Sequence, residues 1–162
     1  MKTHGQSKAI SIIAFCAMAC GASEGSPTDA GTATDAKSGV DCTKETRKDT
    51  FAPGMSKIGA AGFAVELVSA EPSPPARFSN AWKVHVRDPQ GAPRNATLQV
   101  TPWMPDHNHG APTKPIVSTT NVTGEYQIDQ ISLWMPGLWQ VKLHLEDGSA
   151  SDDLTFAFCI EE

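Results

Sequence analysis

Two short segments of this chain gather side chains that can hold a soft metal ion. Each contains a Trp-Met-Pro triplet, at residues 103–105 and again at 134–136, and two histidines follow the first triplet within four residues. Thioether sulfur is a ligand for Cu(I), and imidazole nitrogen suits copper in either oxidation state. The pattern therefore predicts a copper site built from both segments. Its four ligands are Met104, His107, His109 and Met135.

The spacing of the first segment allows its ligands to converge. His107 follows Met104 by three residues and His109 follows His107 by two, in a stretch bounded by prolines, so that a turn can direct these side chains to one point. Asp106 is expected to be an oxygen ligand or, as the favoured alternative, an acceptor that orients an imidazole nitrogen. This spacing is far less diagnostic than paired Cys-x-x-Cys motifs.

Each of these side chains also has a purely structural alternative. Methionine often fills hydrophobic cores, and Met135, which precedes Pro136 and Gly137, can plug the end of a domain together with neighbouring tryptophans. A histidine in a polar loop often only bonds to the backbone. Two other histidines, His85 and His144, alternate onto the solvent faces of predicted strands and are expected to be surface residues.

The elements that position these segments are predicted to be strands. Six runs alternate apolar and polar residues with a period of two: 63–68, 82–87, 95–101, 124–131, 138–146 and 154–160. We predict an all-β fold, an immunoglobulin-like antiparallel β-sandwich of about seven strands, with a closed small barrel as the second choice. Residues 102–115 are rich in proline and are predicted to be a loop, with an edge strand resuming at 116–118.

The N-terminal residues have the pattern of a targeting segment. Lys2 and Lys8 precede a short apolar run that ends in Ala17-Met18-Ala19-Cys20. We interpret residues 1–19 as a secretory signal peptide of the bacterial lipoprotein type and Cys20 as its lipidated residue, although Ala17 stands where leucine is usual. Ordinary secretion is the alternative. No later segment approaches the roughly 20 apolar residues of a spanning helix, so a lipid on Cys20 is the only predicted membrane contact.

Residues 20–41 are predicted to be a flexible tether, because small and polar residues there bury too little apolar area to offset the entropy of ordering. The domain is expected at residues 42–162, of which 42–62 form a lead-in, with at most a short helix and a turn. Without residues 1–19, which hold two lysines and no acid, 11 basic and 18 acidic side chains give a net charge of −7. Such acidity argues against nucleic-acid binding and suits a domain that attracts cations.

Two cysteines remain beyond the predicted lipidation site. Cys42 and Cys159 are expected to form a disulfide in an oxidising compartment, with a free thiol pair as the alternative. The closed loop is long, and the chain-entropy argument gives about 4–5 kcal/mol of stabilisation. The expected location is therefore the periplasm or the outer cell surface.

Several motifs together resemble the YtkA-like domain family. They are Asn80-Ala81-Trp82, the turn at 88–91, the histidine segment at 103–110, Gly124-Glu125-Tyr126 and the second triplet within 133–139. The resemblance covers about residues 62–160, and the paired Met-Pro loops are its most specific part. It implies a small extracytoplasmic β-sandwich similar to FixH-type and CopC-like modules, with copper handling or oxidase assembly suggested for such relatives. Asn108 stands where the family commonly has glycine.

Nothing in the sequence predicts an enzyme. No set of Ser, His and Asp would be brought together by the strand order, and the carboxylate pairs Asp152-Asp153 and Glu161-Glu162 are expected to be solvated strand ends. We predict a surface-tethered, non-enzymatic module that binds copper weakly or transiently and exchanges it with a copper donor or acceptor protein. The alternative is a metal-free interaction module whose two Trp-Met-Pro loops form a rigid hydrophobic end.

Overall fold

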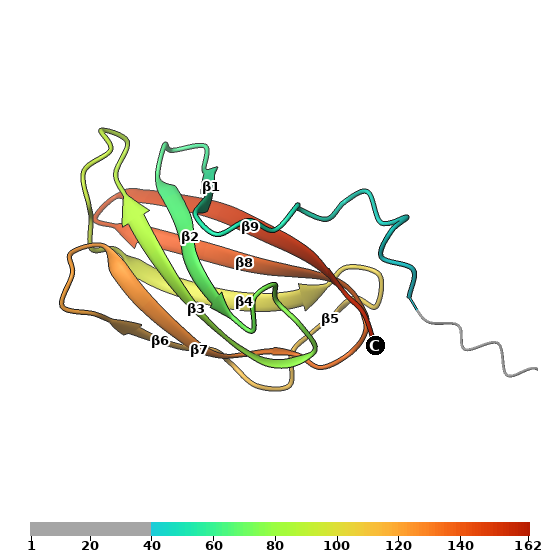
Figure 1. Ribbon diagram of the computed structural model, residues 1–162. Coiled ribbons are helices and arrows are strands. Elements are labelled where there is room, and N and C mark those ends of the chain that lie inside the picture. Colours follow the sequence, from blue (N-terminus) through green and yellow to red (C-terminus); the bar gives the residue numbers. More distant parts are fainter. Residues whose placement is uncertain (1–39) are drawn as a thin grey trace, which may run out of the picture. The chain divides into compact units, whose positions relative to one another are not determined.

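A computed structural model describes residues 40–162, which form a sandwich of two antiparallel β-sheets (Figure 1). The predicted signal peptide, Cys20 and nearly all of the predicted tether lie outside the described residues. No helix in the described part is long and apolar enough to cross a membrane. The nine strands found there are β1 (Met55–Ile58), β2 (Ala64–Glu71), β3 (Phe78–Arg87), β4 (Thr97–Met104), β5 (His109–Gly110), β6 (Ile116–Thr119), β7 (Glu125–Leu133), β8 (Gly137–Asp147) and β9 (Ala150–Ile160).

The strands divide into two separate sheets. The order is β1-β2-β3-β7-β6 in the first sheet and β5-β4-β8-β9 in the second, and Figure 1 shows them as two stacked layers. The predicted antiparallel sandwich is therefore confirmed, and the closed barrel is excluded. The strands outnumber the seven predicted because β1 and the two-residue β5 are too short to show a clear alternation.

One hydrophobic core lies between the sheets. Val84 of β3 and Val141 of β8 are completely buried, as their alternation with polar residues predicts. Trp82 lies at the centre of this core, edge-on to Phe156 and Phe158, with ring centroids 6.1 and 5.6 Å apart. The inward faces of the two sheets thus provide a rigid base for the loops at their ends.

Strand β4 is longer than predicted. It continues through Pro102 to Met104 and stays paired with β8, with Pro102 opposite Val141. The prediction of a loop from residue 102 onward was wrong because the missing N–H of Pro102 faces away from β8. In an antiparallel strand the N–H and C=O of one residue point to the same side. The carbonyl of Pro102 accepts a hydrogen bond from Ala111 N at 3.3 Å on the side away from β8, so the nitrogen of Pro102 faces that side too.

A β-bulge changes which residues of β7 face inward. The β3–β7 register shifts beside Gln130, which has a φ of 60°. Ile128 and Ile131 are three residues apart, yet both are completely buried. A bulge re-aims the side chains that follow it. As a result Leu133, the last residue of β7, is buried, and the chain leaves the sheet with Trp134 at the surface.

The lead-in of residues 42–62 is fastened to the edge strand β9. The predicted disulfide joins Cys42 to Cys159, whose Cα atoms are 5.6 Å apart. Asp49 donates its backbone N–H to the carbonyl of Ala157 (2.7 Å), and its carboxylate accepts the N–H of Ala157 (2.8 Å). The lead-in forms turns and β1 instead of a short helix. The disulfide is consistent with an extracytoplasmic location.

Asp152 is not the solvated strand end that the sequence suggested. Its side chain is only 5% exposed. The carboxylate accepts hydrogen bonds from the backbone N–H groups of Ala61 (3.0 Å), Phe63 (3.2 Å) and Asp153 (3.1 Å). These donors satisfy buried side-chain oxygens that would otherwise lack partners, and they fasten the β1–β2 turn to β9.

Candidate functional site

The two Trp-Met-Pro segments lie at the same end of the sandwich. The first ends β4 and leads into the β4–β5 hairpin, and the second forms the turn between β7 and β8. The imidazole of His109 in the hairpin stacks on the indole of Trp134 in the turn, with centroids 5.9 Å apart and planes inclined by 26°. The Cε of Met104 lies only 2.8 Å from where a Cβ on Gly137 would be. The two segments therefore meet, as the copper hypothesis requires.

His109 is half-buried and held in one orientation. Besides stacking on Trp134, its ring meets Trp139 edge-on at 6.4 Å. Its Nδ1 lies 3.0 Å from the carbonyl oxygen of Gly110. A carbonyl can only accept a hydrogen bond, so Nδ1 is the donor in this contact and Nε2 is the ring nitrogen left for a ligand. Metal-binding histidines are commonly oriented in this way.

His107 is exposed at the tip of the hairpin, close to His109. The two ring centroids are 5.6 Å apart and the planes are inclined by 65°. Asn108 between them has a φ of 53°, a left-handed conformation that asparagine tolerates better than most residues. This residue turns the chain sharply, which allows two imidazoles so near in sequence to approach each other.

Asp106 is held by Arg47 of the lead-in. Nη1 and Nη2 of Arg47 each donate to a different carboxylate oxygen of Asp106 at 2.7 Å. Arg47 also donates to Glu45 at 2.6 and 2.9 Å. The hydrogen bonds from Arg47 to Asp106 and the positive charge of Arg47 hold the pKa of Asp106 below its ordinary value. The structure therefore gives Asp106 a different partner from the imidazole that the sequence suggested.

Met104 is a core residue. Alternation within β4 turns Trp103 to the outer face, where the Nζ of Lys142 lies 5.4 Å from its ring, and turns Met104 inward. The Met104 side chain is 1% exposed and belongs to the hydrophobic core. Gly137 leaves the space that its terminal methyl group occupies. To bind a metal, this thioether would have to leave its packing.

Met135 is more accessible than Met104. It lies in the β7–β8 turn, is half-buried and only borders the core. Its carbonyl accepts a hydrogen bond from the indole Nε1 of Trp139 at 2.8 Å, which fixes the turn. Of the two predicted thioether ligands, Met135 is therefore the one that a surface-bound ion can reach.

A third segment, the β2–β3 loop, reaches the site and was not predicted. Arg77 Nε donates to the carbonyl of Trp134 at 3.1 Å, and the Arg77 guanidinium lies 5.0 Å from the ring centroid of Phe78. The side chain of Asn80, which is buried, bonds to the N–H and the carbonyl of Ala76 at 3.0 and 2.8 Å. The motif Asn80-Ala81-Trp82 was the only sequence signal that pointed to this loop.

No cluster of three or more His, Cys, Asp and Glu side chains able to hold a metal exists among residues 40–162. The candidate ligands at this end are His107, His109 and Met135, so a site built from all three contains one thioether. Hard cations prefer oxygen ligands, whereas thioether sulfur selects Cu(I). The available side chains at this end thus fit a soft ion better than Mg²⁺ or Ca²⁺.

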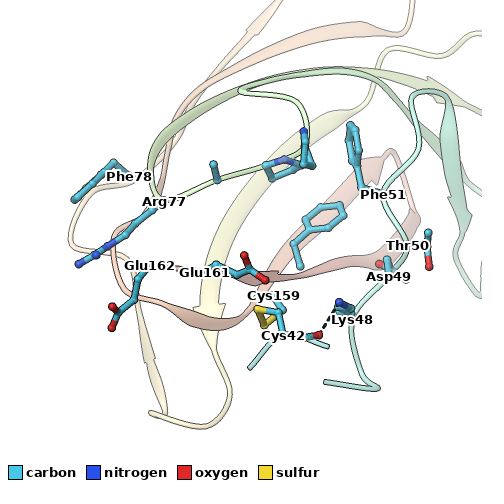
Figure 2. A pocket seen from close by; sticks show the side chains of 14 residues that line it. Cys42, Lys48, Asp49, Thr50, Phe51, Arg77, Phe78, Cys159, Glu161 and Glu162 are labelled. Atoms are coloured by element: carbon cyan, nitrogen blue, oxygen red, sulfur yellow. Dashed lines mark hydrogen bonds between the residues drawn. A yellow bond between two sulfur atoms is a disulfide. The ribbon is translucent and has the colours of Figure 1, made fainter. Parts of the chain in front are cut away.

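A surface groove of about 770 Å³ lies beside the disulfide (Figure 2). Figure 2 shows Lys48 and Phe51 of the lead-in on one side of it. Arg77 of the β2–β3 loop and Phe78 at the start of β3 lie on the other. No histidine or methionine is among its lining residues. The groove is therefore not part of the candidate metal site, although Arg77 borders both.

The family model described as YtkA-like matches residues 59–144, more than half of the chain. The matched region includes both Trp-Met-Pro segments, both hairpin histidines and Asn80. No curated protein and no solved structure matches the chain significantly.

Proposed function

This chain belongs to the YtkA-like family, and on that premise we propose that it is a non-enzymatic, extracytoplasmic copper-handling module. It binds one Cu(I) transiently at the end of the sandwich where the two Trp-Met-Pro segments meet, and it exchanges the ion with a partner protein. His107, His109 and Met135 are the ligands, and Met104 supports them by packing. A lipid on Cys20 would keep the domain at a membrane surface.

The arrangement of the two imidazoles is the observation that carries this proposal. Metal–nitrogen bonds of about 2.0 Å place the centroids of two imidazoles on one ion roughly 5–6 Å apart. The rings of His107 and His109 are 5.6 Å apart. Because the Nδ1 of His109 donates to Gly110, its Nε2 is free to bind. The spacing of the pair is compatible with both rings binding one ion.

The chemistry around the pair supports copper in its reduced state. Met135 is the half-buried thioether of the adjoining turn, and sulfur of this kind selects Cu(I). The negative charge expected for the mature chain attracts cations. Transient binding fits a site with two ligands on one short hairpin and a third on a separate turn.

A metal-free interaction module is the second candidate function. Phe78 is 62% exposed and Trp134 is 39% exposed at this end of the sandwich, and Arg77 lies between them. Aromatic residues and arginine are the side chains that most often carry the binding energy of protein interfaces. This surface would serve a partner protein with or without copper.

Titration with Cu(I) against a competing chelator, under anaerobic conditions, separates the two candidates. We expect one Cu(I) per chain. The double variant His107→Ala, His109→Ala should lose at least about 100-fold in affinity, because it removes two ligands, and loss of a ligand's hydrogen-bond partner alone already costs about 10–100-fold. The matched control is His85→Ala with His144→Ala, which removes two surface histidines of the strands. Unchanged Cu(I) affinity in the hairpin variant would refute the copper proposal and leave the interaction module.

A further inference from the structure

We propose that the free edge of β4 is a docking site for an extended segment of a partner protein. The segment joins the second sheet as a further antiparallel strand, with apolar residues at two alternate positions and an acidic residue beside them. Strand addition of this kind is a common mode of peptide recognition. The inference goes beyond the proposed copper function and does not depend on it, because residues 97–102, which form this edge, include none of the candidate metal ligands.

Strand β4 is paired along nearly its whole length on one side and only at its end on the other. β8 pairs with it from Thr97 to Trp103. On the opposite side β5 pairs only with Trp103 and Met104. Among residues 40–162, no strand pairs with residues 97–101 on that side. Unpaired N–H and C=O groups at the edge of a sheet are a template for another strand.

The alternation of backbone direction identifies the free groups. The nitrogen and carbonyl of Pro102 face away from β8, so the N–H and C=O of Val100 and Leu98 face the same way. Ala96, the next residue in this series, already exchanges two hydrogen bonds with the hydroxyl of Tyr126, at 2.7 and 2.6 Å. The edge therefore offers two donors and two acceptors, at Leu98 and Val100.

Proline ends the ladder between β4 and β5 and leaves this edge open. Continuing the register of Met104 with His109 would place Pro115 opposite Leu98. Proline has no N–H to donate, so the ladder cannot extend to that pair. Residues 111–115 belong to no strand, and a groove of about 470 Å³ lies between β4 and residues 110–117.

The floor of this groove determines which side chains an added strand must carry. Val100, Ala111 and Val117 line the groove, and each is half-buried and packs against the core. In an antiparallel pair, directly opposite residues exchange both hydrogen bonds and point their side chains to the same face. The two residues opposite Leu98 and Val100 therefore point to an apolar surface, so they must be apolar themselves.

The charge of the groove identifies the kind of partner. Lys114 is the one charged residue among those that line it, and it is exposed and forms no ion pair with another described residue. A carboxylate on the incoming segment is complementary to this charge. The β4 edge of a second copy contains no acidic residue between Thr97 and Pro102. The groove therefore fits an acidic segment of a different protein better than a second copy of this chain.

Amide hydrogen exchange of the full protein, followed by NMR, first tests whether the edge is free. Leu98 and Val100 should exchange fast, whereas Gln99 and Thr101 should exchange slowly because their N–H groups face β8. Slow exchange at Leu98 and Val100 that becomes fast on dilution would show that a second copy already occupies the edge. That result would overturn the proposal.

A capped, fluorescently labelled peptide, Thr-Glu-Val-Thr-Val-Glu-Thr, then serves as the probe of docking. We expect a dissociation constant below about 1 mM and slower exchange at Leu98 and Val100 in the complex. N-methylation of both valines should weaken binding at least about tenfold, because it removes the donors that face β4. The matched control is N-methylation of the central threonine, whose N–H faces away from β4 and whose affinity should therefore change little.

Two variants locate the peptide on the protein. Val100→Pro removes a donor that faces the groove and none that faces β8, as Pro102 already does, and it should weaken binding at least about tenfold. Lys114→Ala should weaken binding severalfold and only at low salt. Gln99→Ala is the control, since it changes an exposed side chain of the same strand.

Three outcomes would refute strand addition at β4. They are the absence of peptide binding at about 1 mM, equal affinities for the two N-methylated peptides, and unchanged affinity in a folded Val100→Pro variant. The comparison of the N-methylated peptides uses the unmodified protein, so it decides the question even if Val100→Pro does not fold. Chelator competition for Cu(I) is a separate measurement, and its result does not affect this one.

Discussion

The two Trp-Met-Pro triplets have the same sequence and different structures. In the first, Trp103 and Met104 belong to β4, which turns the tryptophan outward and buries the methionine in the core. In the second, Trp134 and Met135 follow the last residue of β7 and remain at the surface of a turn. The same side chains pack the core in one place and stay available to a ligand in the other.

The difference arises from the element in which each triplet lies. In a paired strand the side-chain direction alternates strictly, so neighbouring residues cannot both face the same side. A turn imposes no such alternation. A ligand motif in a sequence therefore has to be judged with the element that carries it, and by this criterion Met135 is the stronger candidate ligand.

The largest expected effect is the loss in free energy of unfolding when each of the two methionines is truncated. Met104→Ala should lower the free energy of unfolding by about 2–5 kcal/mol, because it leaves a cavity in the core. Met135→Ala should cost about 1 kcal/mol or less, since its side chain only borders the core. Denaturant unfolding followed by circular dichroism measures both values. Equal losses would show that the two methionines do not differ in packing.

Gly137 provides the next largest effect. Its φ is 129°, and a Cβ there would lie 2.8 Å from the Cε of Met104. Gly137→Ala should therefore destabilise the protein by about 1–3 kcal/mol through strain and overpacking. Combined with Met104→Ala, the loss should be smaller than the sum, because the contact is then absent. Additive losses would mean that Gly137 does not accommodate Met104.

For Cu(I) affinity the order should be reversed, with Met135 contributing more than Met104. Met135→Leu is expected to weaken Cu(I) binding about tenfold, or about 1.4 kcal/mol, because it removes a sulfur ligand while keeping the volume. Met104→Leu should change the affinity by less than about threefold, since leucine fills the same core space. Chelator competition measures both. A larger loss in Met104→Leu would place the ligand on β4 instead of the turn.

Much of the fold could be predicted because most core strands alternate with a period of two. The end of β4 could not, since whether a strand tolerates Pro102 depends on which neighbour its nitrogen faces, and a sequence does not show this. The β-bulge of β7 could not be predicted either. It interrupts the alternation, so that Ile128 and Ile131 are both buried although they are three residues apart. The short strands β1 and β5 show no clear alternation, so residues 40–162 contain nine strands where about seven were expected.

The candidate site was predictable only in part. Its two segments were recognised from their residue types, and the contact between His109 and Trp134 brings them together. The roles of Arg47 and Arg77 were missed because their contacts with Asp106 and Trp134 span 59 and 57 residues of sequence. Neither arginine belongs to a motif, so only the folded chain reveals these pairs.

The smallest expected effect concerns how the two segments are held. The first is clamped by the ion pair of Arg47 with Asp106, which lowers the pKa of that carboxyl, whereas the second is held through the neutral carbonyl of Trp134. A lowered pKa adds stability above the ordinary value for aspartate, and this stability is lost as the pH falls through the lowered pKa. Exposed ion pairs contribute little, so the change in stability should be less than about 1 kcal/mol.

The carboxyl resonance of Asp106, followed by NMR as a function of pH, measures this effect. Arg47→Gln should return the pKa of Asp106 toward its ordinary value, while Arg77→Gln should leave it unchanged. An unchanged pKa in Arg47→Gln would show that the ion pair is absent in solution and that the two segments are held alike.

X-ray absorption at the copper edge of the protein loaded with one Cu(I) tests the central claim most directly. We predict a ligand shell of imidazole nitrogens and one thioether sulfur, with the sulfur signal lost in Met135→Leu and retained in Met104→Leu. A shell of nitrogen and oxygen alone, or a sulfur signal lost only in Met104→Leu, would contradict the assignment of packing to the first triplet and metal binding to the second.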